Sequence, residues 1–183
     1  MQIKKRIIMF IVIIILILLL ILGGFFLYER FKPVILTAND GSFQITIPGS
    51  VTFETRSTTD TSDTLDLYSV EDKMFFNTTT VSKTGAINLL DAVNQERVNM
   101  AQYRSTSKDI SEASKISLKD YNAYQYTYQY YDSDFNEDVV CQIVWIETNA
   151  RIYVLDLEVV SSNREKYEPI FQDIIASFTE LSE

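Results

Sequence analysis

The sequence predicts an α+β fold, an antiparallel β-sheet sandwiched between helices, preceded by a single N-terminal transmembrane helix. Three observations carry this prediction. A run of 22 residues without a charge extends from Ile7 to Tyr28. Several stretches after residue 41 alternate between apolar and polar residues, the period of a half-buried strand. The last stretch of the chain repeats its apolar residues at helical spacing.

The apolar run is long enough to cross a bilayer. At about 1.5 Å per helical residue it spans roughly 33 Å, close to the thickness of a hydrocarbon core. Cleavage after Gly23 or Gly24 would place a bulky residue where signal peptidase needs a small one, so we expect an uncleaved anchor. Lys4, Lys5 and Arg6 precede the run. They predict that residues 1–6 are cytoplasmic and that the bulk of the chain is extracytoplasmic.

Composition excludes several kinds of chemistry. The chain has no His and one Cys, Cys141. It therefore forms no internal disulfide, no Ser-His-Asp triad and no His-ligated zinc site. Residues 33–183 carry 24 acidic and 11 basic residues, a net charge of −13. A domain this acidic repels nucleic acid and anionic lipid headgroups, so no nucleic acid is expected as a partner. The membrane is expected as a partner through the apolar run at 7–28, together with a protein of the envelope.

The first part of the domain is predicted to be mainly extended. Residues 29–40 contain Pro33 and end in a turn signal, which favours a short stalk. Strands are predicted at 42–47 and 51–55, followed by a polar loop at 56–64. The next two strands, 65–70 and 74–81, have the spacing of a hairpin around residues 71–73.

A helix is predicted next, ending near Arg104. The turn residues of 82–85 are expected to begin it. Its helical stripe consists of Leu89, Leu90, Val93, Met100 and Ala101. Residues 105–120 are polar and are expected to form a loop with one short strand.

Three strands are predicted at 121–131, 139–148 and 151–160, the last two joined by a tight hairpin. The middle strand is apolar on both faces, with Cys141, Ile143 and Trp145 on one side and Val140, Val144 and Ile146 on the other. We expect this strand to be central, with layers above and below it.

A closing helix has the cleanest pattern in the domain. Its apolar face consists of Tyr167, Ile170, Phe171, Ile174, Ile175 and Phe178. Pro169 is tolerated only near the first turn of a helix. The helix is therefore expected to begin around Glu168, or to follow a separate turn at 163–166.

The order of elements, together with the end motifs at 43–48 and 174–178, resembles the PsbP/Mog1-like superfamily. The resemblance covers residues 41–179, with a tail at 180–183, and implies an antiparallel sheet sandwiched between helices. Plant members assist the oxygen-evolving side of photosystem II and yeast-type members bind a small GTPase of nuclear transport, while many bacterial members look like lipoproteins or anchored proteins. This chain has an anchor helix without a lipobox Cys. The resemblance therefore points to a bacterial membrane-anchored PsbP-like protein.

Two candidate sites lie in the predicted three-strand run. Asp132, Asp134 and Asn136 place oxygens at alternate positions, as in a calcium loop. The loop lacks its turn Gly and its final Glu, which favours a solvated acidic hairpin tip over a metal site. The tyrosines of the preceding strand share one face and could stack a sugar or an aromatic ligand, although such a row is more often a core face: Tyr124, Tyr126, Tyr128 and Tyr130.

No catalytic residue or cofactor is predicted. Carboxylates that could pair for acid–base work, at positions 60, 63 and 66 or at 132 and 134, all lie in polar stretches where their pKa would not be raised. Cys141 is expected to be a buried, inert thiol. Hydrolytic chemistry would require paired, buried carboxylates in a cleft.

We therefore expect a non-catalytic domain held at the cell membrane of a Gram-positive-type bacterium. The first hypothesis is a binding or scaffold domain, anchored through residues 7–28, that contacts another envelope protein. The alternative is a receptor domain for a small ligand or a cation, using the tyrosine strand or the acidic tip.

Overall fold

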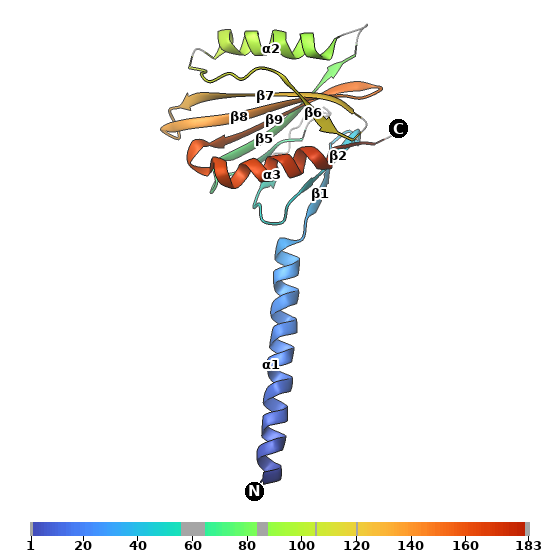
Figure 1. Ribbon diagram of the computed structural model, residues 1–183, viewed down its shortest axis with the longest axis vertical. Coiled ribbons are helices and arrows are strands. Elements are labelled where there is room, and N and C mark those ends of the chain that lie inside the picture. The colour runs from blue at the N-terminus through green and yellow to red at the C-terminus, as the bar shows by residue number, and fades with distance from the viewer. Residues whose placement is uncertain (1, 56–64, 84–87, 105, 120, 182–183) are drawn as a thin grey trace.

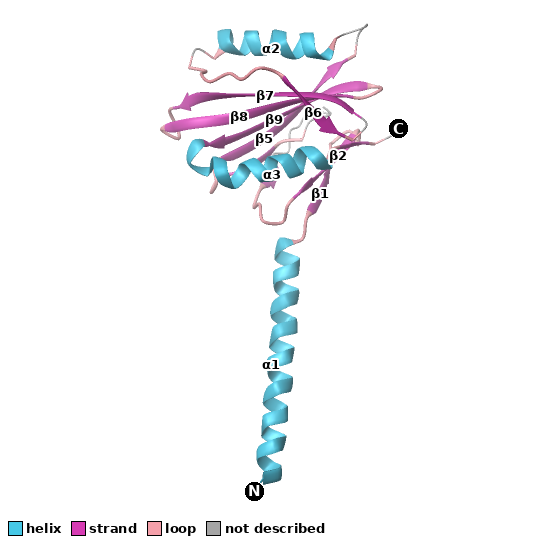
Figure 2. Ribbon diagram, in the orientation of Figure 1, coloured by secondary structure: helices cyan, strands magenta, loops and turns pink. Residues whose placement is uncertain are grey.

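The fold is α+β, with antiparallel sheets and helices, as the sequence predicts (Figures 1 and 2). The computed structural model describes residues 2–55, 65–83, 88–104, 106–119 and 121–181, with the backbone alone at 2–12, 26–27, 29–30 and 55. The predicted loop at 56–64 lies outside the described residues, as do Asp60 and Asp63.

The helices are α1 (Gln2–Phe31), α2 (Leu89–Tyr103) and α3 (Arg164–Ser177), and α3 follows a 3₁₀ turn at Ser161–Asn163. The strands are β1 (Val34–Thr37), β2 (Phe43–Ile47), β3 (Glu54–Thr55), β4 (Leu67–Ser69), β5 (Met74–Ser82), β6 (Ser114–Leu118), β7 (Tyr121–Asp132), β8 (Glu137–Glu147), β9 (Arg151–Val160) and β10 (Thr179–Glu180).

The larger sheet has the strand order β3-β4-β5-β9-β8-β7-β6, and its neighbouring strands are antiparallel. Both predicted hairpins form, β4–β5 and β8–β9. β8 lies between β9 and β7 and is buried on both faces, which confirms its predicted interior position, while β9 is the middle strand. Helices α2 and α3 lie on opposite faces of this sheet (Figure 1).

The main core lies between α3 and the sheet. α3 buries the residues predicted for its apolar face: Tyr167, Ile170, Phe171, Ile174 and Ile175. Phe178 follows the helix end and is also fully buried. Burying six large side chains of this kind contributes about 1.5 to 3 kcal/mol each before entropy is counted.

The predicted start of this helix is wrong. α3 runs without interruption from Arg164, so Pro169 occupies its sixth position rather than its first turn. Proline there removes one backbone hydrogen bond. We attribute its tolerance to the apolar face around it, since Ile170 and Phe171 are both buried.

α2 packs much more lightly than α3. Only Leu89 and Val93 of its predicted stripe are buried, while Ala101 is exposed. Its N-cap is Asn88, whose Oδ1 accepts hydrogen bonds from the backbone N–H of Leu90 (3.0 Å) and Asp91 (3.4 Å). The helix therefore begins after the turn residues of 82–85 that were expected to cap it.

The predicted stalk at 29–40 is part of the fold. α1 continues to Phe31, and β1 then pairs with β2 in a second, three-stranded sheet of order β1-β2-β10. Val34 and Leu36 pair with Ile47 and Ile45, whose side chains are buried. The strand was missed because Val34, Ile35 and Leu36 are consecutive apolar residues, so the short segment shows no alternation in the sequence.

The end of α1 lies directly against the turn after β2. A Cβ atom added at Gly49 would be 2.3 Å from the carbonyl carbon of Phe31, closer than real Cβ contacts come. Only glycine fits there, so this turn and the helix end are in direct backbone contact. Among the described residues, no helix combines the length and the apolarity required of a membrane span.

Candidate functional site

The tyrosine row of β7 lies on the sheet face beneath α2. Tyr126 and Tyr128 are buried, with 1% and 0% of their surface exposed, while Tyr124 and Tyr130 are half-buried. The rings of Tyr126, Tyr128 and Tyr130 are stacked at successive centroid distances of 6.3 Å. They belong to the same cluster as Leu89 and Val93 of α2. This arrangement supports a core face over an open stacking platform.

A charged group lies at one end of this row. Glu158 of β9 accepts a hydrogen bond from the Tyr130 hydroxyl (3.0 Å) and forms an ion pair with Nη1 of Arg104 (3.3 Å). The Arg104 guanidinium, directly after α2, lies 4.4 Å from the centre of the Tyr130 ring. This contact adds cation–π attraction to the ion pair. Arg104 thus ties the C-terminal end of α2 to the sheet.

Asp156 lies two residues before Glu158 on the same face of β9. Burial, and then the negative charge of Glu158, raise the pKa of its carboxyl, and Arg104 opposes them only in part. Among the described residues, its Oδ1 atom has no hydrogen-bond partner although it is buried, and the same holds for the Tyr126 hydroxyl and Nε1 of Trp145. Such groups are costly to bury, and ordered water or a ligand usually satisfies them.

The Cys141 thiol lies among these residues and is fully buried. Its Sγ atom is 3.6 Å from Oε1 of Glu158. Burial, and then the negative charges of Glu158 and Asp156, raise the pKa of this thiol. It therefore stays protonated at neutral pH and is a poor nucleophile, as predicted.

The acidic tip is the turn between β7 and β8. Oδ1 of Asp132 accepts hydrogen bonds from the backbone N–H of Asp134 (2.8 Å) and Phe135 (3.1 Å). Oδ1 of Asn136 accepts one from the Tyr131 hydroxyl (2.8 Å). These oxygens stabilise the turn itself. Among the described residues there is no group of three or more His, Cys, Asp or Glu side chains that could hold a metal.

An apolar recess of about 200 Å³ lies between the β4–β5 turn and the β7–β8 turn. It is lined by Tyr68, Ser69, Val70, Lys73, Met74, Phe75, Phe135, Val139 and Glu158. Val70 and Phe135 at its rim are 73% and 41% exposed. The recess thus joins the acidic tip to the carboxylate that holds Arg104.

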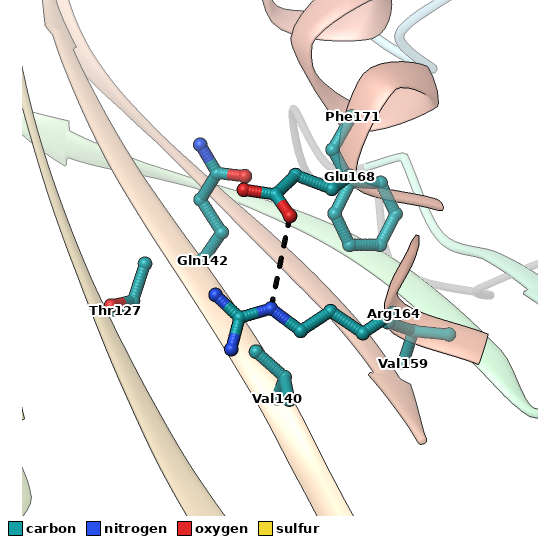
Figure 3. A pocket seen from close by; sticks show the side chains of 7 residues that line it. All are labelled: Thr127, Val140, Gln142, Val159, Arg164, Glu168 and Phe171. Carbon is teal, nitrogen blue, oxygen red and sulfur yellow. Dashed lines mark ion pairs between the residues drawn. The ribbon is translucent and has the colours of Figure 1, made fainter. Parts of the chain in front are cut away.

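A second recess lies under α3 (Figure 3). Its volume is about 40 Å³, and Thr127, Gln142 and Phe171 are among its lining residues. Arg164 and Glu168 of α3 form an ion pair across its mouth, with 3.8 Å between Nε and Oε2. A space of this size holds a few water molecules and no larger ligand.

The tyrosine row has a local sequence signal, whereas the recess between the β4–β5 and β7–β8 turns has none. The tyrosines were visible from their alternation, but the recess joins turns that are about 60 residues apart in the sequence. A signal for the acidic pair did exist. Asp156 and Glu158 alternate with Leu155 and Leu157 in a strand flanked on both sides by other strands, so two carboxylates had to face a covered layer.

The architecture defines the chain as a domain with the PsbP/Mog1 fold, as the resemblance implied. No protein-family model matches the sequence, and no curated protein matches it. The identification of the fold therefore depends on three-dimensional likeness to solved structures.

Three of the solved structures that resemble this chain illustrate the likeness. LpqN of Mycobacterium tuberculosis, described as involved in cell envelope biogenesis, has a TM-score of 0.57 and 12% identity over 82% of this chain and 91% of its own. Cyanobacterial PsbP of Synechocystis sp. PCC 6803 has a TM-score of 0.58 and 9% identity over 82% and 94%. The Ran-binding protein Mog1p of Saccharomyces cerevisiae has a TM-score of 0.56 and 9% identity over 81% and 95%.

Proposed function

We propose that this protein is a non-catalytic binding or scaffold domain, anchored to the cell membrane by residues 7–28, that contacts another protein of the envelope. The observation that carries the proposal is the connection between the apolar helix and the domain. Only Lys32 and Pro33 separate the end of α1 from β1. A domain joined so closely to a membrane helix works at the bilayer face, within reach of other membrane proteins.

The fold supports a binding role. Mog1p, which has this fold, is described as a Ran-binding protein, and LpqN is described as involved in cell envelope biogenesis. Two groups that serve as nucleophile or base in many enzymes, the Cys141 thiol and the Asp156 carboxyl, are held toward their neutral forms in this chain. The pKa of Cys141 and that of Asp156 are both raised by burial.

The anchor is tested by labelling in intact cells. Tyr103 is 80% exposed on α2, whereas the single native thiol is buried, so the Tyr103→Cys variant has one reactive thiol. We expect a membrane-impermeant maleimide to label it without lysis, and the chain to stay with membranes in alkaline carbonate until detergent is added. Release by carbonate, or labelling only after lysis, contradicts the anchored, extracytoplasmic arrangement.

The partner is tested by photo-cross-linking in the same cells. A photoreactive residue at several exposed positions of the domain should yield a discrete adduct with a membrane protein. If no position gave a cross-linked adduct, the result would count against a scaffold role.

A receptor for a small ligand is the alternative. The observation that favours it is a set of buried polar atoms beneath α2, in Tyr126, Trp145 and Asp156, that find no partner within the described segments. A polar ligand that entered when α2 lifted would satisfy them. Thermal-shift screening of the full chain with sugars and with Ca²⁺ tests this alternative, and a rise in melting temperature of several degrees is the expected result.

A further inference from the structure

We propose that the apolar recess between the β4–β5 and β7–β8 turns is the docking site for a protein segment that inserts one bulky apolar side chain and carries lysine or arginine beside it. This inference rests on the proposed binding function and adds to it the surface and the chemistry of the partner.

The recess has the size and lining of a site for one side chain. Its volume is about 200 Å³, and Phe75 and Val139 of the sheet are among the residues that line it. Exposed Val70 and Phe135 stand at its rim, on the two turns. Apolar anchors that fill such recesses provide most of the energy of a protein interface.

Both turns are fixed in place, so the recess exists before a partner arrives. Asp72 of the first turn is held by Nζ of Lys166 (2.6 Å) and by the Tyr167 hydroxyl (2.7 Å) of α3. The second turn is held by the hydrogen bonds that Asp132 accepts and by the ion pair of Asp138 with Lys108 (2.7 Å). A preformed recess loses little entropy on binding.

The charge around the recess indicates that the partner segment carries lysine or arginine. The two turns, Glu158 and the side chains paired with them carry seven carboxylates and four cations. The carboxylates are Glu71, Asp72, Asp132, Asp134, Glu137, Asp138 and Glu158, and the cations are Lys73, Arg104, Lys108 and Lys166. Three of the cations are already paired with carboxylates, Arg104 with Glu158, Lys108 with Asp138 and Lys166 with Asp72. The surround is therefore negative, and complementarity favours a basic segment.

The role of Lys73 is consistent with this chemistry. Its Nζ atom lies 5.4 Å from the centre of the Phe135 ring, at the rim of the recess. It also lies near Glu137, whose pKa is lowered mainly by its hydrogen bond with Ser162 and in part by Lys73. Lys73 thus interacts with residues of the second turn. The carboxylates around the recess still outnumber the cations.

The test uses three synthetic peptides with blocked ends and the full chain in detergent micelles. Their sequences are Lys-Lys-Trp-Lys-Lys, Lys-Lys-Ser-Lys-Lys and Glu-Glu-Trp-Glu-Glu. Binding is followed by NMR of the methyl groups of Val70, Met74 and Val139, which line the recess. We expect the first peptide to shift these methyls, the second to bind at least tenfold more weakly, and the third to give no saturation.

Two variants locate the site. Phe135→Ala removes an exposed wall of the recess and should weaken the first peptide at least fivefold, while Tyr103→Ala, exposed on α2 outside the lining, should leave its affinity unchanged. The proposal would be overturned if the tryptophan and serine peptides bound with equal affinity. It would also be overturned if Phe135→Ala bound the first peptide as tightly as the wild-type chain, or if the methyl signals did not shift. Tight binding of the glutamate peptide would overturn its charge argument.

This result is separable from the anchored function. The peptide assay needs neither a bilayer nor the native partner. If labelling and cross-linking succeed while the peptides fail, the domain binds through another surface. If the peptides bind while the anchor test fails, the recess remains a docking site on a protein that works elsewhere.

Discussion

At the residue scale, the most informative group is the pair of carboxylates on β9. Glu158 has an ion pair with Arg104 and a hydrogen bond from Tyr130, but Oδ1 of Asp156 has no partner in the part of the chain that the structure describes. Because their hydrogen-bond partners differ, the two carboxylates have opposite effects on stability. Glu158 holds the end of α2, whereas an ionised Asp156 is destabilising because its charge is buried beside another negative charge.

Asp156→Asn is expected to stabilise the protein, and more so at higher pH. The folded pKa of Asp156 is raised above its unfolded value of about 3.9. The stability of the wild-type protein that comes from keeping Asp156 protonated is therefore complete below about pH 3.9 and is lost as pH rises through the folded pKa. Urea unfolding should show a gain of about 1 kcal/mol at pH 8 that shrinks toward pH 4. Asp173→Asn, exposed on α3, is the control. A gain that does not depend on pH would refute the titration argument.

At the scale of elements, α2 and α3 cover opposite faces of the sheet with very different packing. α3 buries five large side chains, while α2 buries only Leu89 and Val93. α2 therefore depends on the ties at its ends, the Asn88 cap and Arg104. We expect α2 to be the first element of the domain to open.

Arg104→Met is expected to loosen α2 selectively. The change removes the ion pair with Glu158 and the contact with the Tyr130 ring, while it keeps an apolar stem. Hydrogen exchange should show that the opening free energy of α2 amides falls by about 1 to 2 kcal/mol, with β8 amides unchanged. Equal loss of protection in α2 and β8 would mean that the variant lowers global stability instead.

Tyr167→Phe is expected to weaken the contact of α3 with the β4–β5 turn. Burial raises the pKa of Asp72, but the hydrogen bonds from Lys166 and Tyr167 outweigh it, so the pKa is lowered overall. The variant should lose about 1 to 2 kcal/mol at pH 7. Asp72 contributes stability above its unfolded pKa that is lost as pH falls through its lower folded pKa, so acid unfolding of the variant should be less steep. Tyr103→Phe, at an exposed position, serves as the control.

At the scale of the whole molecule, the helix and the domain are joined by contact as well as by chain. Gly49, in the turn after β2, lies against the backbone of Phe31, and only two residues separate α1 from β1. Small motions of α1 should therefore be passed to the small sheet and through β10 to the end of α3. A flexible connection in place of β1 would have uncoupled them.

Gly49→Val is expected to break this coupling. The new Cβ would lie 2.3 Å from the carbonyl carbon of Phe31, so the helix end must move. Spin labels at Leu22→Cys and Thr52→Cys, measured by pulsed electron resonance in micelles, should give a narrow distance distribution that broadens in the variant. Ser50→Val, at the exposed neighbouring position, is the matched control. An unchanged distribution in Gly49→Val would show that the turn does not hold the helix.

The sequence by itself determined the local elements, because their signals are local. Alternation located β7 and β9, and a strand apolar on both faces located β8 between them. The helical stripe from Tyr167 to Phe178 located α3 and its buried face. Residue types alone also implied that Cys141 is an inert, buried thiol, and its full burial and raised pKa bear this out.

Only the tertiary structure decided what depends on distant residues meeting. β1 forms because β2 offers a partner and a buried face, and Pro169 is tolerated inside α3 because the core holds the helix on both sides of it. The recess between Val70 and Phe135 joins turns that share no sequence pattern. Such features depend on the packing of separate segments, which no local period encodes.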